Sequence, residues 1–412
     1  MSIRWMTAAL LVSIPFTPDL SAQPNDTGKW HVMQDAVVYG LFNHQGGQRG
    51  GDEMRVPNWW MGMFGRKAGA SNLTINTMLS LDPLTVGKQG YRELFQVGET
   101  FEGKPLIDYQ HPHDFFMQLA AVWRRPIGTK TGFTLAGGPS AEPALGPVAF
   151  MHRASARENP MSPLSHHTFD STHIAFGVVT AAVDHGPWTL EASVFNGREP
   201  DEDRWDFDFG ALDSYAGRLW FQPSEELELQ FSSGLLKNPE ELGHGDIVRT
   251  TASASWLQRN GPDAEEFTAA TVAVGVNNTA AVNRGALLLE GTKRSGRYST
   301  YGRLEFVEVE TGVLLDDHSL GHDIKDTVMS ITVGVVRELP RWWKLETGLG
   351  GAATFYGVPE RLETAYGNSP VSLQVFFRVR PTPGTTGRMW NMHMTKPMHP
   401  AVLDPHAGHQ MP

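Results

Sequence analysis

The side chains best suited to chemistry are histidines in two short clusters. Neutral imidazole brings a free lone pair at pH 7, so imidazoles and carboxylates at short spacing suit a borderline metal such as Cu(II), Zn or Ni. The spacing matches no defined zinc motif, and an alternative is that these side chains hydrogen-bond within a folded loop. The candidate metal ligands are His111, His113 and Asp114 in the first cluster, and His166, His167, Asp170 and His173 in the second.

A second group of candidate ligands lies near the C-terminal end. Five of the 16 methionines and four of the 16 histidines fall within residues 381–412, a proline-rich segment that we predict to be disordered. Thioether favours Cu(I) and imidazole suits Cu(II), so such a segment can hold copper in either state. The candidate ligands here are Met389, Met392, His393, Met394, Met398, His399, His406, His409 and Met411.

Catalytic motifs are weak. The sequence contains no G-x-S-x-G elbow. Ser165 and Ser171 lie close to Asp170 and His173, but a catalytic triad normally assembles from distant segments, so this local arrangement is poor support for a hydrolase. We therefore predict no enzyme, and an outer-membrane hydrolase is the weaker alternative.

In the segments that must position these residues, apolar and polar side chains alternate with a period of two. Near the end of the chain, Val371, Leu373, Val375, Phe377 and Val379 share one face of an extended segment. The opposite face is polar except for one phenylalanine; it carries Ser372, Gln374, Phe376, Arg378 and Arg380. An aliphatic face and a charged face on one strand are typical of a wall with lipid outside and water inside.

Similar segments recur along the chain and predict about 16 strands. They cover about 31–42, 55–66, 72–81, 114–125, 131–138, 172–184, 188–194, 213–222, 227–232, 247–257, 267–276, 284–292, 303–307, 326–338, 343–356 and 371–380. A soluble β-sandwich also alternates. Charged residues on the polar faces and tryptophans near strand ends favour instead an all-β fold, a transmembrane antiparallel barrel.

The N-terminus and the composition set further limits. Residues 1–22 read as a secretory signal peptide, with a basic start, an apolar run and a small-residue cleavage site. No apolar stretch reaches the length of about 20 residues that a membrane helix needs. The chain has no cysteine, and its net charge of −11 argues against binding to nucleic acid.

One region departs from the alternating pattern. Residues 98–171 are rich in proline, glycine and histidine, and proline interrupts strand pairing. We predict that this region is a long His-rich insertion, either an external loop or a segment folded into the pore, and that it carries the function.

Several strings resemble a family of exported bacterial outer-membrane β-barrel proteins associated with copper and heavy-metal resistance. They are D-Y-Q-H-P-H-D at 108–114, G-P-V-A-F-M-H-R at 146–153, D-S-T-H at 170–173 and F-N-G-R-E-P-D-E at 195–202. The resemblance covers much of 105–220 and implies no catalytic residues. Ordinary outer-membrane barrels end on their last strand, whereas here residues 381–412 follow it.

Together these observations predict one outer-membrane barrel over residues 23–380 in a Gram-negative bacterium. Its expected role is passage or binding of a small solute or metal ion, with copper favoured as the ion. The expected partners are outer-membrane lipid, metal ions and periplasmic metal-handling proteins, and no nucleic acid. The alternative is a structural or partner-binding barrel that does not conduct.

Overall fold

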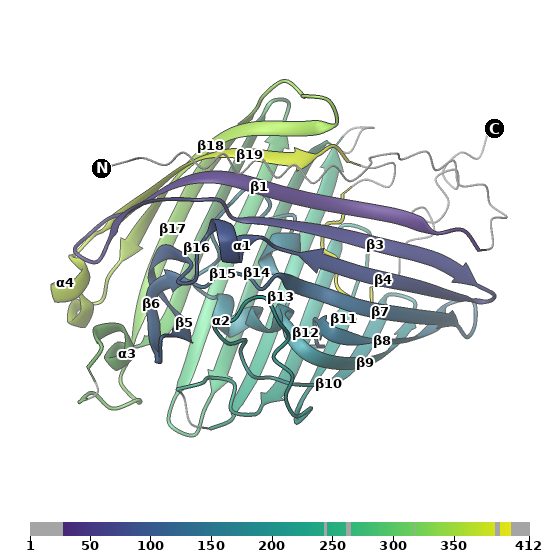
Figure 1. Ribbon diagram of the computed structural model, residues 1–412, viewed down its shortest axis with the longest axis horizontal. Coiled ribbons are helices and arrows are strands. Elements are labelled where there is room, and N and C mark those ends of the chain that lie inside the picture. Colours follow the sequence, from purple (N-terminus) through teal and green to yellow (C-terminus); the bar gives the residue numbers. More distant parts are fainter. Residues whose placement is uncertain (1–27, 243–244, 261–264, 318, 384–387, 397–412) are drawn as a thin grey trace.

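The computed structural model describes residues 28–242, 245–260, 265–317, 319–383 and 388–396, which form one large barrel with filled interior (Figure 1). The signal peptide expected at 1–22 lies outside these residues. Among the described helices, none combines the length and the apolar character that a membrane crossing requires.

Strands make up most of the chain. The first ten are β1 (His31–Gln45), β2 (Gly51–Arg55), β3 (Asn58–Ala68), β4 (Ser71–Leu79), β5 (Tyr91–Phe101), β6 (Lys104–Gln110), β7 (Phe116–Pro126), β8 (Thr131–Ala141), β9 (Ala175–His185) and β10 (Trp188–Phe195). The others are β11 (Ser214–Phe221), β12 (Leu227–Leu236), β13 (Ile247–Asn260), β14 (Glu266–Asn278), β15 (Asn283–Ser295), β16 (Tyr298–Glu310), β17 (Lys325–Glu338), β18 (Leu345–Gly357) and β19 (Val371–Pro381). The helices are α1 (Asp82–Thr85), α2 (His166–Phe169), α3 (Thr311–Leu315) and α4 (Glu360–Tyr366), and there are 3-10 turns at Phe150–His152 and Ser171–His173.

The strands close into an antiparallel ring. β1 pairs with β3 on one side and with β19 on the other, where Val38 lies opposite Val379. The short strand β2 also pairs with β1, so β2 and β3 together act as one strand broken at residues 56 and 57. Within the described residues the ring therefore has 16 strands, and β5 and β6 form a separate small sheet. The expected all-β barrel of about 16 strands is confirmed.

Side chains alternate across the wall as the sequence pattern predicts. Along β19, Leu373, Val375 and Phe377 are exposed on the outer face, while Ser372, Gln374 and Arg378 are buried on the inner face. The one apolar residue on the inner face, Phe376, packs edge-on against Tyr39 with ring centroids 5.5 Å apart. An apolar outer face and a polar inner face are what a wall between lipid and a lumen requires.

The two ends of the barrel differ. Short turns join β3 to β4, β7 to β8 and β9 to β10 at one end, where β1 begins and β19 ends. The long connections, including those with α3 and α4, lie at the other end (Figure 1). In outer-membrane barrels the short turns face the periplasm and the long loops face the exterior, which orients this chain.

The expected insertion at 98–171 is divided in the structure. β7 and β8 lie inside that range but belong to the barrel wall, where β7 pairs with β4 and β8 pairs with β9. Two inward segments remain, residues 80–115 with α1, β5 and β6, and residues 142–174 with α2. We call these two segments the plug. The alternating pattern at 114–125 and 131–138 already marks the strands that separate them.

The C-terminal segment also differs from expectation. We predict disorder from residue 381 onward, but residues 388–396 lie in the lumen at the short-turn end (Figure 1). Arg388 pairs with Asp35 on β1 at 3.0 Å and with Glu346 on β18 at 2.6 Å, and Lys396 pairs with Glu228 on β12 at 2.6 Å. These ion pairs and the burial of methionines explain why this part is ordered despite its proline-rich surroundings.

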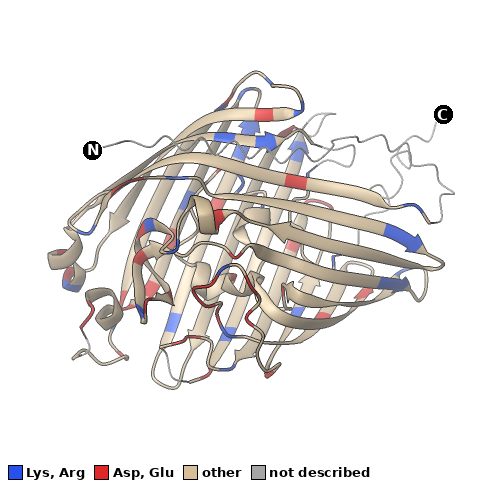
Figure 2. Cartoon of the chain, viewed as in Figure 1, with Lys and Arg blue, Asp and Glu red and all other residues tan. Residues whose placement is uncertain are grey.

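Buried ion pairs join the plug to the wall. Glu158 of the plug is fully buried and pairs with Arg378 and Arg380 on β19. Acidic and basic positions lie close together on β18 and β19 (Figure 2). Side chains that would face water in an open pore are thus covered by the plug. Other such pairs are Arg153 with Glu290 on β15 at 2.7 Å, and Glu142 with Arg218 on β11 at 2.6 Å.

Placing a charge on the outer face at mid-strand should destabilise the barrel. Val375 is 53% exposed and lies at the centre of β19. Val375→Arg should lower the free energy of unfolding by about 2–4 kcal/mol, because the charge enters the lipid midplane. Urea titration of protein folded into vesicles measures this. Trp343→Arg, in the β17–β18 turn, is the control and should cost about 1 kcal/mol or less; equal effects at both positions would contradict a lipid-facing wall.

Candidate metal centre

Five histidines of the plug gather inside the barrel. α2 supplies His166 and His167, the following 3-10 turn supplies His173, and the residues after β6 supply His111 and His113. Neighbouring ring centroids are 5.2 Å apart for His166 and His167, 5.5 Å for His111 and His167, and 5.8 Å for His113 and His173. Segments separated by two wall strands therefore meet in one imidazole cluster, which we call the histidine centre.

Three of these side chains have the spacing of a metal site. His111, His166 and His167 each offer a ring nitrogen, and the three nitrogens lie within 4.8 Å of one another. His111 and His166 are buried. A single ion placed among the three could contact all of them, since metal–imidazole nitrogen bonds are about 2 Å long.

The ring orientations leave one nitrogen of each imidazole available. All five Nε2 atoms are buried and lack a hydrogen-bond partner. Because the neighbours of Nδ1 are acceptors, Nδ1 carries the proton and Nε2 keeps its lone pair. Oriented imidazoles with a carboxylate or carbonyl on the second nitrogen are typical of metal sites. The Nδ1 neighbours are Glu99 Oε1 for His111 (3.1 Å), Asp82 Oδ2 for His113 (2.8 Å), Asp170 Oδ1 for His166 (2.7 Å), Glu199 Oε1 for His167 (3.5 Å) and the Asp170 carbonyl for His173 (2.8 Å).

Burial keeps three of these rings neutral, those of His111, His166 and His173. It lowers the pKa of the His166 imidazole to about 4, although the hydrogen bond to Asp170 opposes the shift. Burial likewise holds the pKa values of His111 and His173 well below the ordinary value, and the positive charge of Arg204 and the neighbouring imidazoles lower that of His111 further. At pH 7 these three side chains are uncharged, which is the form that binds metal.

The two predicted carboxylate ligands, Asp114 and Asp170, are not part of the three-histidine group, and both have other partners. Asp170 accepts hydrogen bonds from Arg153 Nη1 at 2.8 Å and from the Phe150 backbone N–H at 2.9 Å, besides orienting His166. Asp114 pairs with Arg204 at 3.4 Å. The geometry gives Asp170 an orienting role, and it places Asp114 where it holds residues 196–213 against the plug.

The predicted C-terminal ligands divide into two sets. Met389, Met392, His393 and Met394 lie in the lumen, where the His393 ring stacks on Trp220 with centroids 4.1 Å apart. The remaining five, Met398, His399, His406, His409 and Met411, lie outside the described residues.

The serines considered for hydrolysis have partners other than histidine. The Ser165 hydroxyl donates to Glu305 on β16 at 2.6 Å, and Ser171 accepts a hydrogen bond from Arg249 on β13 at 2.9 Å. Both contacts join the plug to the wall, so the geometry gives these hydroxyls a structural role.

Sequence reasoning missed the carboxylates that orient the imidazoles. Asp82 and Glu99 come from the first plug segment, and Glu199 comes from the loop after β10. Asp82 and Glu199 are too far from His113 and His167 in the sequence for spacing alone to reveal these contacts. The only available signal was that Glu99 falls inside the irregular region.

Solved structures with a similar fold are outer-membrane barrels. They include OprB of Pseudomonas putida (8% identity, TM-score 0.52, 85% of this chain and 94% of that chain) and OmpF of Salmonella typhi in complex with daunomycin (7%, 0.50, 85% and 97%). A loop-deletion mutant of OmpT, an outer membrane protein of Vibrio cholerae, also matches (8%, 0.50, 85% and 99%). At these identities the likeness concerns the fold. No protein-family model and no curated protein matches the chain.

The closed 16-strand ring, its apolar exterior and these neighbours define a porin-like outer-membrane β-barrel. The protein is located in the outer membrane of a Gram-negative bacterium, with lipid against its outer face.

Releasing the plug from the wall should expose the plug to proteases and open the lumen to ions. Arg153 is fully buried between Asp170 and Glu290, so Arg153→Met leaves buried carboxylates with fewer partners and should cost about 3–5 kcal/mol. We expect faster proteolysis within residues 142–174 and a higher single-channel conductance in planar bilayers. Arg361→Met is the control, because its ion pair with Asp326 is exposed and should contribute about 1 kcal/mol or less. Unchanged proteolysis in Arg153→Met would contradict an anchoring role.

Proposed function

We propose that this porin-like barrel binds a divalent transition-metal ion at the histidine centre, with Cu(II) as the favoured ion. Two observations carry the proposal: the buried Nε2 atoms have no hydrogen-bond partner, and His111, His166 and His167 each offer a ring nitrogen within 4.8 Å of the other two. Buried polar atoms normally have partners, so such a group without any needs an explanation. A shared metal ion supplies one.

The surroundings suit a cation. Asp170 and Glu199 lie beside Nδ1 of His166 and His167 and bring negative charge close to the position that an ion would occupy, and Glu99 lies beside Nδ1 of His111. Three nitrogen ligands suit Cu(II), Zn(II) and Ni(II), and Cu(II) binds such donors most tightly of the three. The methionines and histidines of the C-terminal segment further favour copper.

The filled lumen favours binding, or passage controlled by the plug, over free diffusion. The plug is tied to the wall at more than one place: Glu158 pairs with Arg378 on β19, and Arg153 pairs with Glu290 on β15. A second candidate function is therefore a barrel that binds a metal or a partner and does not conduct. Ion conductance of the wild type in planar bilayers separates the two.

Removal of two ligands should abolish tight metal binding. We expect His111→Ala with His167→Ala to weaken Cu(II) binding at least 100-fold, because one imidazole cannot replace three. Calorimetric titration against a competing chelator gives the affinity, and the nitrogen hyperfine pattern of bound Cu(II) gives the number of imidazoles. His322→Ala, at an exposed histidine in the loop after α3, is the control. Wild-type affinity in the double variant would rule out this centre.

The carboxylate behind His167 should also matter. Glu199→Gln removes a negative charge 3.5 Å from Nδ1 of His167 and should weaken metal binding about 10- to 100-fold without removing a ligand. The same titration measures the effect. Glu360→Gln, at an exposed residue of α4, is the matched control and should bind as the wild type does. Equal affinity in both variants would show that Glu199 does not orient a ligand.

A further inference from the structure

Four methionines lie on the inner face of neighbouring wall strands. Met61 and Met63 belong to β3, Met78 belongs to β4, and Met117 belongs to β7. Met61 is directly opposite Met78 in the β3–β4 register. The β4–β7 pairing shifts register after Met78, at the position where Met117 lies on β7. All four are buried. The inner face of such barrels is normally polar, so this group of thioethers is a departure that calls for a reason.

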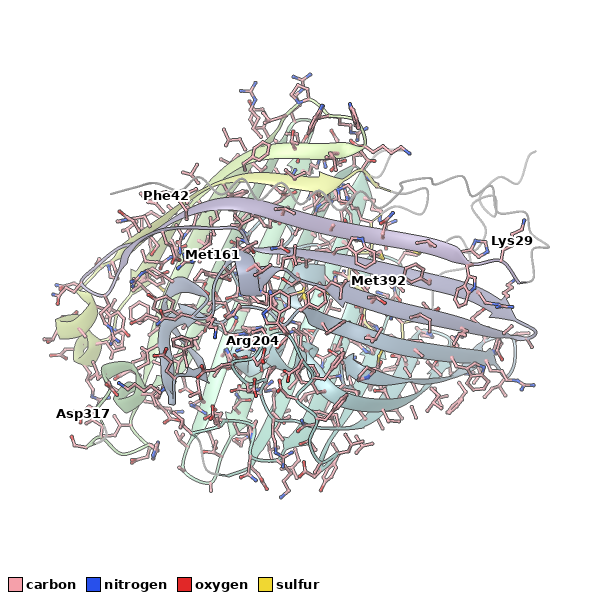
Figure 3. All side chains as sticks on the ribbon, in the orientation of Figure 1. Lys29, Phe42, Met161, Arg204, Asp317 and Met392 are labelled. Carbon is pink, nitrogen blue, oxygen red and sulfur yellow. The ribbon has the colours of Figure 1, made fainter. Side chains whose placement is uncertain are left out.

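The C-terminal segment completes a pocket over these methionines. Met392 and Met394 line it together with the four wall residues, and about 30 Å³ of free space remains, enough for a water molecule or one ion. Figure 3 labels Met392, which lies within the outline of the barrel. Six sulfur-bearing side chains from two distant parts of the chain therefore surround one small space, which we call the methionine pocket.

Two histidines also reach this pocket. His393 lines it and is almost completely buried, and its Nδ1 atom lies 3.6 Å from Glu191 Oε1. His173 lines it as well, and its unpartnered Nε2 atom makes it a link to the histidine centre. The one carboxylate in the lining, Glu142, is held by Arg218 at 2.6 Å.

Packing alone does not explain this composition. Methionine fills irregular gaps well, but leucine serves the same purpose with a better-defined shape. Here methionine recurs on three adjacent strands and on the segment that covers them, beside the buried Nε2 atom of His173, which lacks a hydrogen-bond partner. Thioether donors are soft and carry no charge, so a pocket in which they predominate selects a soft cation of low charge.

We propose that the methionine pocket binds a soft monovalent metal ion, Cu(I), through the thioethers of Met61, Met63, Met78 and Met117 on the wall and of Met392 and Met394 in the C-terminal segment. This inference rests on the proposed metal function but concerns a separate site with a different ligand type. The pocket lies where the C-terminal segment, which enters from the short-turn end, meets the plug, which enters from the long-loop end. It therefore places a site for the soft ion on the periplasmic side of the histidine centre.

The test uses Ag(I), which has the charge and softness of Cu(I) and does not change oxidation state under the assay. Full-length protein labelled at the methionine methyl carbons is titrated with Ag(I) in detergent and followed by NMR. The expected result is a shift of the Met61, Met63, Met78 and Met117 methyl signals. If none of these signals moves in the wild type, the proposal is wrong.

A variant that lacks two of the six thioethers sharpens the test. Met61→Leu with Met78→Leu keeps the side-chain volume and should weaken Ag(I) binding at least tenfold. Met161→Leu is the matched control, because Met161 is a buried methionine of the plug outside the pocket, and it should bind Ag(I) as the wild type does. Wild-type Ag(I) affinity in the double variant would overturn the proposal.

Parallel titration with Cu(II) separates this site from the histidine centre. The double leucine variant should lose Ag(I) affinity and keep Cu(II) affinity, which supports two sites. A wild type that shifts its methionine signals with Ag(I) but binds no Cu(II) would remove the proposed function and leave the methionine pocket supported.

Discussion

Closure of the backbone hydrogen-bond ladder is the constraint on which the rest of the structure depends. In lipid a strand edge has no water to satisfy its N–H and C=O groups, so a sheet can cross the membrane only if its first and last strands pair. β1 meets this need by pairing with β3 along one side and with β19 along the other. The closed wall separates an apolar exterior from a lumen in which charged residues are stable, and only such a lumen can hold the plug, the histidine centre and the methionine pocket.

Electrostatics then decides what fills the lumen. Ion pairs such as Glu158 with Arg378 are fully buried, and breaking a buried pair is costly. They hold the plug in one position, and the plug in turn fixes α2. A metal site needs rigid support, because mobile ligands lower the affinity of the site for its ion. Asp170 both anchors the plug and orients a proposed ligand. Its Oδ2 atom accepts a hydrogen bond from Arg153, and its Oδ1 atom contacts Nδ1 of His166. The anchoring of the plug and the geometry of the proposed site are therefore coupled.

The sequence predicted the wall well and the interior only in part. A period of two is a local property, so β19 and its neighbours could be placed from residue type alone, including the inward Phe376. The two histidine clusters were also visible, but their meeting was not, because it depends on how β7 and β8 pair in the wall between them. The same holds for residues 388–396, whose order comes from partners on β1, β12 and β18 that are distant in sequence. Met61, Met78 and Met117 look like ordinary apolar strand residues until the register places them on the inner face.

The position of Arg388 has a consequence for the lifetime of the closed barrel. Its two acidic partners stand on β1 and β18, the strands on either side of β19. The guanidinium thus bridges the joint where the two ends of the sheet meet, which is the place where a barrel would first open. Arg388, which lies beyond the final strand, therefore stabilises the contact between β1 and β19. Because it can form both ion pairs only once β1 and β19 are side by side, it slows opening of the closed barrel and is not needed for the first pairing of these strands.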